Sequence, residues 1–294
     1  MKNTLVLISD PARPSLDAET VQRAAEILWS NGGSVGAPDW LAPGIACEIA
    51  FDGRPQALSL PGVDAVILPT ANRRKRLLVA DMESTMIENE MLDELADFLG
   101  LRDKIAGITA RAMNGELDFG AALEERVGLL AGLPIGKLDE AARRIRYMPG
   151  GATLVATMKH HGATCALVSG GFTCFTGIVK KALAFDVEAA NVLKHDGTTL
   201  SGAVELPILG KEAKLATLAR LCQERGLPIG ETITVGDGAN DLPMLKAAGL
   251  GVAFHAKPVV AAEVAARIDH GDLTALLYLQ GYRQSDFIER SDPP

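Results

Sequence analysis

The chain has 294 residues, of which 48% are apolar, and a formal net charge of −8. This length allows about two domains of ordinary size, and the acidic balance argues against nucleic acid or an anionic membrane as a general partner. No apolar run reaches the ~18 residues of a membrane span. The short apolar run near the N-terminus is too short for a secretory signal, so we expect a cytoplasmic protein. The four cysteines are scattered without CxxC spacing, which predicts buried, unpaired thiols.

The first part of the chain combines one helix with several short strands. Residues 4–8 are apolar and predict a strand, and a helix is predicted from Asp17, because Val21, Ala24 and Leu28 share one helical face. Three further strands are predicted around residues 34–40, 45–51 and 63–69. This order predicts a small α+β domain over residues 1–72.

Residues 71–76 read ANRRKR and contain four consecutive basic residues. Such a run is compatible with a nucleic-acid patch, but the acidic chain favours a solvated linker between two domains.

From Leu77 the pattern changes to short, continuous apolar runs separated by helical stretches. Residues 77–80, 165–168, 233–235 and 251–254 form these runs. Such runs are typical of parallel strands that are covered on both faces. The pattern therefore predicts an α/β domain over residues 73–294.

The segments between these strands are mainly helical. Residues 88–148 follow the first strand and predict a helical insertion that could cover a site as a cap. Residues 186–205 predict strands around a turn at 195–197, and 210–225 predict a helix. The last four residues, 291–294, are expected to be frayed.

Three of the predicted strands end in polar clusters: DMEST at 81–85, SGG at 169–171 and GDGAND at 236–241. Parallel strands place their carboxyl ends at one edge of a sheet, which is where ligands bind. Taken singly, each cluster is also compatible with an ordinary polar turn. Together they supply a carboxylate nucleophile, backbone donors for phosphate and two aspartates for a metal.

Transfer of a phosphoryl group to a carboxylate requires further groups. Mg²⁺ neutralises the phosphate, and an acid protonates the leaving alcohol. A lysine usually holds the nucleophile and the phosphate, and the helix at 210–225 offers Lys211 and Lys214.

These motifs, in order and spacing, resemble those of the haloacid-dehalogenase-like phosphatases, and most closely the phosphoserine phosphatases. The resemblance extends over about residues 77–272 and rests on DMESTMIENEMLDELADFLG, LVSGGFT and TVGDGANDLPMLKAAGLGVAFHAKP. It implies a Rossmann-like core with a helical cap (about 88–148) inserted after the first core strand. Residues 1–72 resemble an ACT-like regulatory domain more weakly, because its second helix is missing around 52–62.

The resemblance implies roles for the matching positions. Asp81 would be the nucleophile and a Mg²⁺ ligand, and the carbonyl of Glu83 and the carboxylate of Asp237 would complete the metal contacts. Asp241 would support the metal, and the spacing to Asp237 selects Lys214 over Lys211. Phosphate would be bound by Ser169, Gly170 and Asn240.

Substrate recognition would come from the cap. The resemblance implies that Glu90 binds the amino group of the substrate and Arg126 its carboxylate, a pairing that suits a planar guanidinium. Met113 and Phe119 would form an apolar wall. Without the resemblance, Glu90 and Arg126 would be read as solvated helix charges, and Met113 and Phe119 as core.

Glu83 departs from the family pattern, which has aspartate at this position. The residue should protonate the leaving oxygen and then activate water, and the extra methylene displaces its carboxyl group outward. General acid–base catalysis contributes about 10²–10⁴-fold. We expect an active enzyme, with slower chemistry than an aspartate would give.

The resemblance thus implies Mg²⁺-dependent hydrolysis of O-phospho-L-serine to L-serine and phosphate through an aspartyl-phosphate, the last step of serine biosynthesis. The alternatives are a phosphatase or phosphotransferase for another small phosphate, or a non-catalytic amino-acid sensor disabled at Glu83. The expected partner is a small phosphomonoester. Neither nucleic acid nor a membrane is expected as a partner, and a homodimer is compatible with the sequence.

Overall fold

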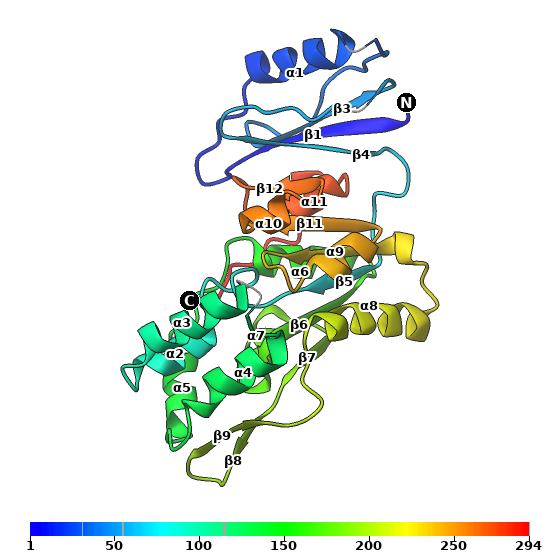
Figure 1. Ribbon diagram of the computed structural model, residues 1–294. Helices are drawn as coiled ribbons and strands as arrows, with labels where there is room; N and C mark the ends of the chain where they lie inside the picture. Colours follow the sequence, from blue (N-terminus) through cyan, green and yellow to red (C-terminus); the bar gives the residue numbers. More distant parts are fainter. Residues whose placement is uncertain (31, 55, 114–115, 294) are drawn as a thin grey trace.

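The computed structural model describes residues 1–30, 32–54, 56–113 and 116–293. Figure 1 shows a small N-terminal unit stacked on a larger α/β unit. The first contains a four-stranded antiparallel sheet in the order β2-β3-β1-β4, and the second a six-stranded parallel sheet in the order β12-β11-β10-β5-β6-β7. None of the helices in the described ranges is long and apolar enough to cross a membrane.

The N-terminal sheet is built around one central strand. β1 (Asn3–Ser9) pairs with β3 (Ala46–Phe51) and β4 (Val63–Pro69), and α1 (Ala18–Ser30) follows β1. These elements confirm the predicted strands and helix. The described parts of 52–62 contain no helix, as expected.

The second strand lies further along the chain than predicted. The sequence predicted a strand around 34–40, whereas β2 is Asp39–Ala42. Pro38 cannot donate to a strand ladder, and Gly36 weakens a strand, so regular pairing begins only after them.

Both faces of the N-terminal sheet are covered. Leu5 and Leu7 of β1 point to the cluster that contains Leu28 of α1. Val6 and Ile8, on the other face, belong to the main core, together with residues of β12 and α11. Successive apolar residues of β1 therefore point to opposite faces of the sheet, and both faces are buried. Because one face packs against the second unit, the two units form one packed body.

The basic segment between the units is a solvated linker only in part, because Arg74 and Arg76 are exposed as predicted whereas Arg73 and Lys75 are not. The Arg73 guanidinium donates to Glu48 Oε2 at 2.7 Å and to two carbonyls of α11 (Ala275–Leu279) at 2.9 Å. The Lys75 ammonium is buried and donates to the Gly230 carbonyl at 2.7 Å. These side chains fasten the segment to both units, because buried charges need polar partners.

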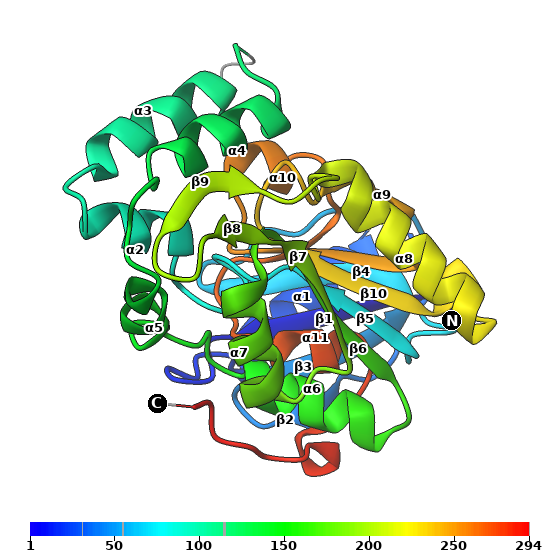
Figure 2. The ribbon, with the colours of Figure 1, turned by 90° about the horizontal axis from the view of Figure 1, so that it is seen from below.

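The parallel sheet confirms the predicted α/β class. Its strands are β5 (Leu77–Ala80), β6 (Thr164–Phe172), β7 (Val187–Asn191), β10 (Thr232–Gly236), β11 (Leu250–Phe254) and β12 (Ala266–Ile268). One face of the sheet is covered by α6 (Gly151–His160) and α7 (Thr173–Leu183). The opposite face is covered by α8 (Lys211–Arg225) and α9 (Leu242–Ala247), as Figure 2 shows. Leu78 and Ala80 pack on the α6/α7 side, and Leu77 and Val79 on the α8 side.

Four helices lie in the described part of the segment between β5 and α6. They are α2 (Met91–Asp97), α3 (Arg102–Met113), α4 (Phe119–Gly128) and α5 (Gly136–Ala142). With the hairpin β8 (Leu193–His195) and β9 (Leu200–Val204) they lie on the side of the molecule away from the N-terminal sheet (Figure 1). Only part of the predicted strand region 186–205 forms this hairpin, because β7 joins the main sheet.

Three short elements complete the described chain. They are α10 (Pro258–Ala261) and the 3₁₀ turns η1 (Ile229–Glu231) and η2 (Gln284–Asp286). The end of the chain is not frayed at Asp292, contrary to the prediction. The Asp292 carboxylate accepts from the N–H of Gly150 at 2.8 Å and of Ala152 at 2.7 Å. It therefore satisfies the free donors at the start of α6.

Candidate active site

Three aspartates meet at the carboxyl edge of the parallel sheet. Asp81 follows β5 directly, and Asp237 follows the neighbouring strand β10. One oxygen of each of Asp81, Asp237 and Asp241 lies within 4.8 Å of the others, and all three side chains are buried. Because hard divalent cations prefer clustered oxygen ligands, this cluster is suited to hold one.

Lys214 of α8 joins two of these carboxylates. Its fully buried ammonium lies 2.6 Å from Asp81 Oδ1 and 2.6 Å from Asp241 Oδ1. Asp241 is held further by the backbone N–H of Gly238, which donates to its Oδ2 at 3.0 Å. Lys211, the other candidate lysine, is exposed and lies beside Glu212. The structure therefore places Lys214, and not Lys211, in the cluster.

Burial and crowding shift the proton affinities of this cluster. The pKa of Asp81 is raised to about 8 by burial and by the charge of Asp241, against the opposing effect of Lys214. Burial also raises the pKa of Asp237. For Lys214, burial acts against the ammonium, but the two carboxylates outweigh it and raise the pKa. An added cation would favour the ionised carboxylates.

Lys257 also reaches the cluster, although the sequence analysis did not select it. Its ammonium lies 3.2 Å from Asp237 Oδ2, and its backbone N–H donates to the Asp237 carbonyl at 3.0 Å. The available signal was position, because Lys257 comes three residues after the predicted strand 251–254, whose carboxyl end lies at the same sheet edge.

Glu83 lies beside the cluster and is tied to the helical segment. Its Oε1 accepts from the backbone N–H of Met91 at 2.9 Å. A Cβ placed on Gly171 would lie 3.0 Å from Glu83 Oε2, so any larger residue there would push this carboxyl group from its position. Burial, and then the charge of Glu90, raise the pKa of Glu83 to about 8. The group therefore retains a proton near neutral pH and can donate it.

The SGG cluster is the end of β6, which continues to Phe172, and not a turn before the next helix. Ser169 Oγ accepts from the N–H of Gly171 at 2.9 Å. The carbonyl of Gly170 is fixed by the Asn191 amide at 2.8 Å. A Cβ on Gly170 would lie 4.0 Å from Asn240 Nδ2, which brings Asn240 to the same place.

Residues of the helical segment close this edge. The ring of Phe119 lies against Gly170, since a Cβ there would be 3.0 Å from Phe119 Cζ. Glu90 accepts from Ser84 Oγ at 2.8 Å, so this hydroxyl of the DMEST cluster is engaged by a carboxylate. The side chain of Met113 lies outside the described residues.

Arg126 is half-buried and has no carboxylate of the described chain within 4.0 Å of its nitrogens. It donates to the Ala122 carbonyl at 3.1 Å and to Thr109 Oγ1 at 3.5 Å. Burial lowers its pKa, although the charges of Glu83 and Glu90 act in the opposite direction. A guanidinium in this state is available to an incoming anion.

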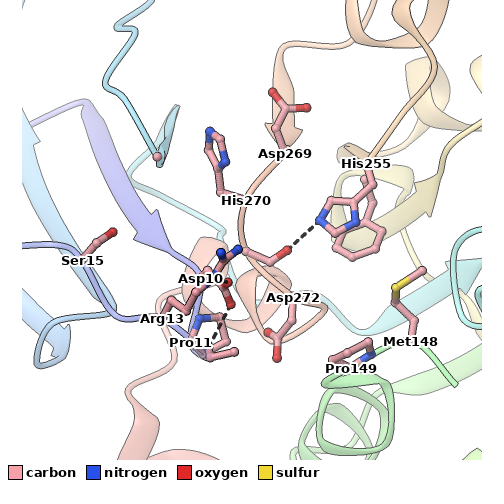
Figure 3. A pocket seen from close by; sticks show the side chains of 14 residues that line it. Asp10, Pro11, Arg13, Ser15, Met148, Pro149, His255, Asp269, His270 and Asp272 are labelled. Carbon is pink, nitrogen blue, oxygen red and sulfur yellow. Dashed lines mark hydrogen bonds and ion pairs between the residues drawn. The ribbon is translucent and has the colours of Figure 1, made fainter.

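A separate cavity of about 770 Å³ lies between the two units (Figure 3). It is lined by the loop after β1, with Asp10 and Arg13, by His255 after β11, and by His270 and Asp272 after β12. None of the three clustered aspartates lines it, so this cavity is not the site of the carboxylates.

Comparison with known proteins adds to this geometry. A family model described as haloacid dehalogenase-like hydrolase matches residues 78–246. A phosphoserine phosphatase of Streptomyces coelicolor is 41% identical over 233 residues, which cover 79% of this chain and 57% of that protein. The chain spans little more than half the length of several such curated relatives.

Two solved structures are similar in fold. A probable phosphoserine phosphatase from Vibrio cholerae has a TM-score of 0.79 at 29% identity and covers 97% of this chain and 88% of its own. A phospho-aspartyl intermediate analogue of phosphoserine phosphatase has a TM-score of 0.65 at 38% identity and covers 70% and 98%. The family model spans more than half of this chain, which therefore belongs to the haloacid dehalogenase-like hydrolases.

Proposed function

We propose that the protein hydrolyses O-phospho-L-serine to L-serine and phosphate through an aspartyl-phosphate on Asp81, as the last step of serine biosynthesis. The observation that carries this proposal is the buried group of Asp81, Asp241 and the Lys214 ammonium that joins them at 2.6 Å. Relatives with 41% identity are named phosphoserine phosphatases, and a similar structure is described as a phospho-aspartyl intermediate analogue.

In the first step a carboxylate oxygen of Asp81 attacks phosphorus. The bond from phosphorus to the serine oxygen breaks, and Glu83 gives its proton to that oxygen. Lys214 keeps Asp81 oriented and offsets its charge as the phosphate dianion approaches. Its second bond to Asp241 fixes the ammonium in place.

In the second step a water molecule attacks the phosphorus of the aspartyl-phosphate. Glu83, now ionised, takes the proton from that water, and the bond between phosphorus and Asp81 breaks. Its pKa of about 8 suits both transfers, because a group that exchanges protons near neutral pH is an effective acid and base.

The oxygen donors of the cluster fit Mg²⁺. The carboxylates of Asp81 and Asp237 and the carbonyl of Glu83 would hold the ion, with Asp241 supporting it. When bound, Mg²⁺ neutralises charge on the phosphate and on the nucleophile. Ser169, Gly170 and Asn240 would receive the oxygens of the phosphoryl group.

Specificity for an amino-acid substrate comes from α2–α4. Arg126, which has no carboxylate partner among the described residues, would bind the substrate carboxylate, and Glu90 its ammonium. Phe119 would exclude water from the phosphoryl group, and Met113 would extend this wall. In this proposal α2–α5 are a cap, within a domain of residues 73–294.

Residues 1–72 would form an ACT-like α+β domain. An antiparallel sheet with one helix on its outer face supports this reading. The homodimer and the cytoplasmic location stay predictions from the sequence.

The test is release of phosphate from O-phospho-L-serine with Mg²⁺, by the native chain and by Asp81→Asn. Turnover that Asp81→Asn abolishes, and that is much slower with glycerol phosphate, would support the proposal. Equal rates with both phosphates would exclude amino-acid specificity. A native chain that binds phosphoserine without turnover would favour the sensor alternative.

A further inference from the structure

The charges around the aspartate cluster are arranged in two separate groups. The Lys214 ammonium lies between Asp81 and Asp241, at 2.6 Å from each. Asp237 is left without this partner and is paired with Lys257, at 3.2 Å. The two lysines differ in exposure, because the side chain of Lys214 is 0% exposed and that of Lys257 is 46% exposed. Lys214 is thus built into the core, whereas Lys257 reaches Asp237 from the solvent side.

We propose that Lys257 sets the charge balance of the site: its ammonium competes with Mg²⁺ for Asp237 and strengthens binding of the phosphate. This inference rests on the proposed function in taking the three aspartates as a Mg²⁺ site. It adds a residue that the mechanism above does not use.

The first half of the proposal follows from shared ligands. Asp237 offers one carboxylate oxygen to the group suited to a cation, and its Oδ2 lies 3.2 Å from the Lys257 ammonium. A second cation beside this carboxylate repels Mg²⁺, and the ammonium must share the carboxylate with the ion or leave it. Loss of the ammonium should therefore tighten Mg²⁺ binding.

The second half follows from the reach of the Lys257 charge. Its ammonium lies 3.2 Å from Asp237 Oδ2, and one oxygen of Asp237 lies within 4.8 Å of an oxygen of Asp81, so the positive charge is close to the nucleophile. A phosphate dianion on Asp81 would meet the same positive charge. Loss of the ammonium should therefore weaken phosphate binding.

The side-chain charge of Lys257 can be removed without loss of its backbone contact to Asp237. Its N–H donates to the Asp237 carbonyl at 3.0 Å, and this bond survives any side-chain substitution except proline. A variant such as Lys257→Met therefore removes the ammonium and leaves the main-chain support of Asp237. Because the side chain is half-exposed, replacing it with the apolar methionine, which is of similar length, costs little stability.

The experiment is titration calorimetry on the full chain, first with Mg²⁺ alone and then with inorganic phosphate at saturating Mg²⁺. We compare the native chain with Lys257→Met, Lys257→Gln and Lys257→Arg. The control is Lys246→Met. Lys246 is an exposed lysine of α9, and its ammonium lies 2.8 Å from the Glu263 carboxylate. This control changes the net charge equally but not the charge at Asp237.

We expect Lys257→Met and Lys257→Gln to lower the Kd for Mg²⁺ about three- to tenfold and to raise that for phosphate by a similar factor. Lys257→Arg and Lys246→Met should leave both within about twofold. The proposal is overturned if Mg²⁺ binding is unchanged or weaker in both neutral variants, if Lys246→Met gives the same shifts, or if the native chain binds no Mg²⁺. Phosphoserine turnover is not part of this readout. A chain that shows the shifts but does not hydrolyse phosphoserine would refute the proposed substrate and leave this inference intact.

Discussion

The backbone N–H of Met91 donates to Oε1 of Glu83 at 2.9 Å, which ties the strand-end motif to the first residue of α2. The carboxyl group of Glu83 is therefore held by the start of the helical segment that would cover the substrate. Orientation of an acid by a fixed donor is one way in which a longer side chain can remain useful.

Glu83→Gln keeps the acceptor for Met91 but cannot exchange a proton. We expect its kcat for phosphoserine to fall about 10²–10⁴-fold. Glu83→Asp keeps the acid, and its kcat should stay within about tenfold of the native value. Steady-state phosphate release measures both, and full activity of Glu83→Gln would remove Glu83 from proton transfer.

Lys214→Met leaves two buried carboxylates, Asp81 and Asp241, without their ammonium. Removal of one partner from a buried ion pair costs about 3–5 kcal/mol, so we expect this loss in the free energy of unfolding. Added Mg²⁺ should recover part of it. Urea unfolding with and without Mg²⁺ measures both effects, with exposed Lys211→Met as the control. Equal stability of the two variants would contradict the arrangement.

Asp64 of β4 is buried and holds the loop that follows β12. Its carboxylate accepts from the backbone N–H groups of Asp269 at 2.8 Å, His270 at 3.1 Å and Gly271 at 2.8 Å. We expect Asp64→Ala to lower the free energy of unfolding by about 2–4 kcal/mol, because these donors lose a charged acceptor. Asp64→Asn keeps one acceptor oxygen and should lose less. Urea unfolding checks the order, and an alanine variant as stable as the native chain would refute it.

Asp196, in the turn between β8 and β9, makes the stability of the protein depend on pH. The Thr198 hydroxyl, and then the N–H groups of Thr199 and Thr198, lower its pKa below the ordinary value of 3.8. A lowered pKa stabilises the fold above the unfolded value, and the effect is lost as the pH falls through the folded value. Asp196→Ala should therefore melt below the native chain at pH 7, and the difference should shrink toward about pH 2. A difference in melting temperature that does not depend on pH would contradict this assignment.

Asp292 supplies the acceptor at the start of α6. Asp292→Ala should cost about 1 kcal/mol of unfolding free energy, since it removes a carboxylate from two helix N-terminal donors. Glu289→Ala, an exposed change nearby, is the matched control. Thermal unfolding compares them, and equal melting temperatures would show that the end of the chain contributes nothing.

Much of the architecture could be predicted because its signals are local. Apolar runs such as 77–80 and 233–235 mark covered parallel strands, and the residues that follow them must share one edge. Asp81 and Asp237 were therefore predictable as neighbours, although 156 positions separate them. The choice of Lys214 over Lys211 followed only from the family resemblance, because an isolated helical lysine is usually solvated, and its contact with Asp241 was not predicted.

What sequence patterns missed depends on packing between distant segments. Arg73 and Lys75 looked solvated, and only their partners Glu48 and Gly230 explain why they are buried. Lys257 follows a predicted strand, but the strand order that brings it beside Asp237 is a property of the sheet. Side-chain partners of this kind are not encoded by periodicity.

The N-terminal sheet carries apolar residues on both faces, one toward α1 and one toward the main core. Cutting the chain after residue 72 would uncover Val6, Ile8 and Val66 on one piece and their counterparts around Ile268 and Leu276 on the other. Each piece alone would expose a continuous apolar patch, the kind of surface that promotes aggregation. The two units are thus separable in sequence but not as modules, and exchanging the first unit for that of a relative would require the second unit to carry a matching surface.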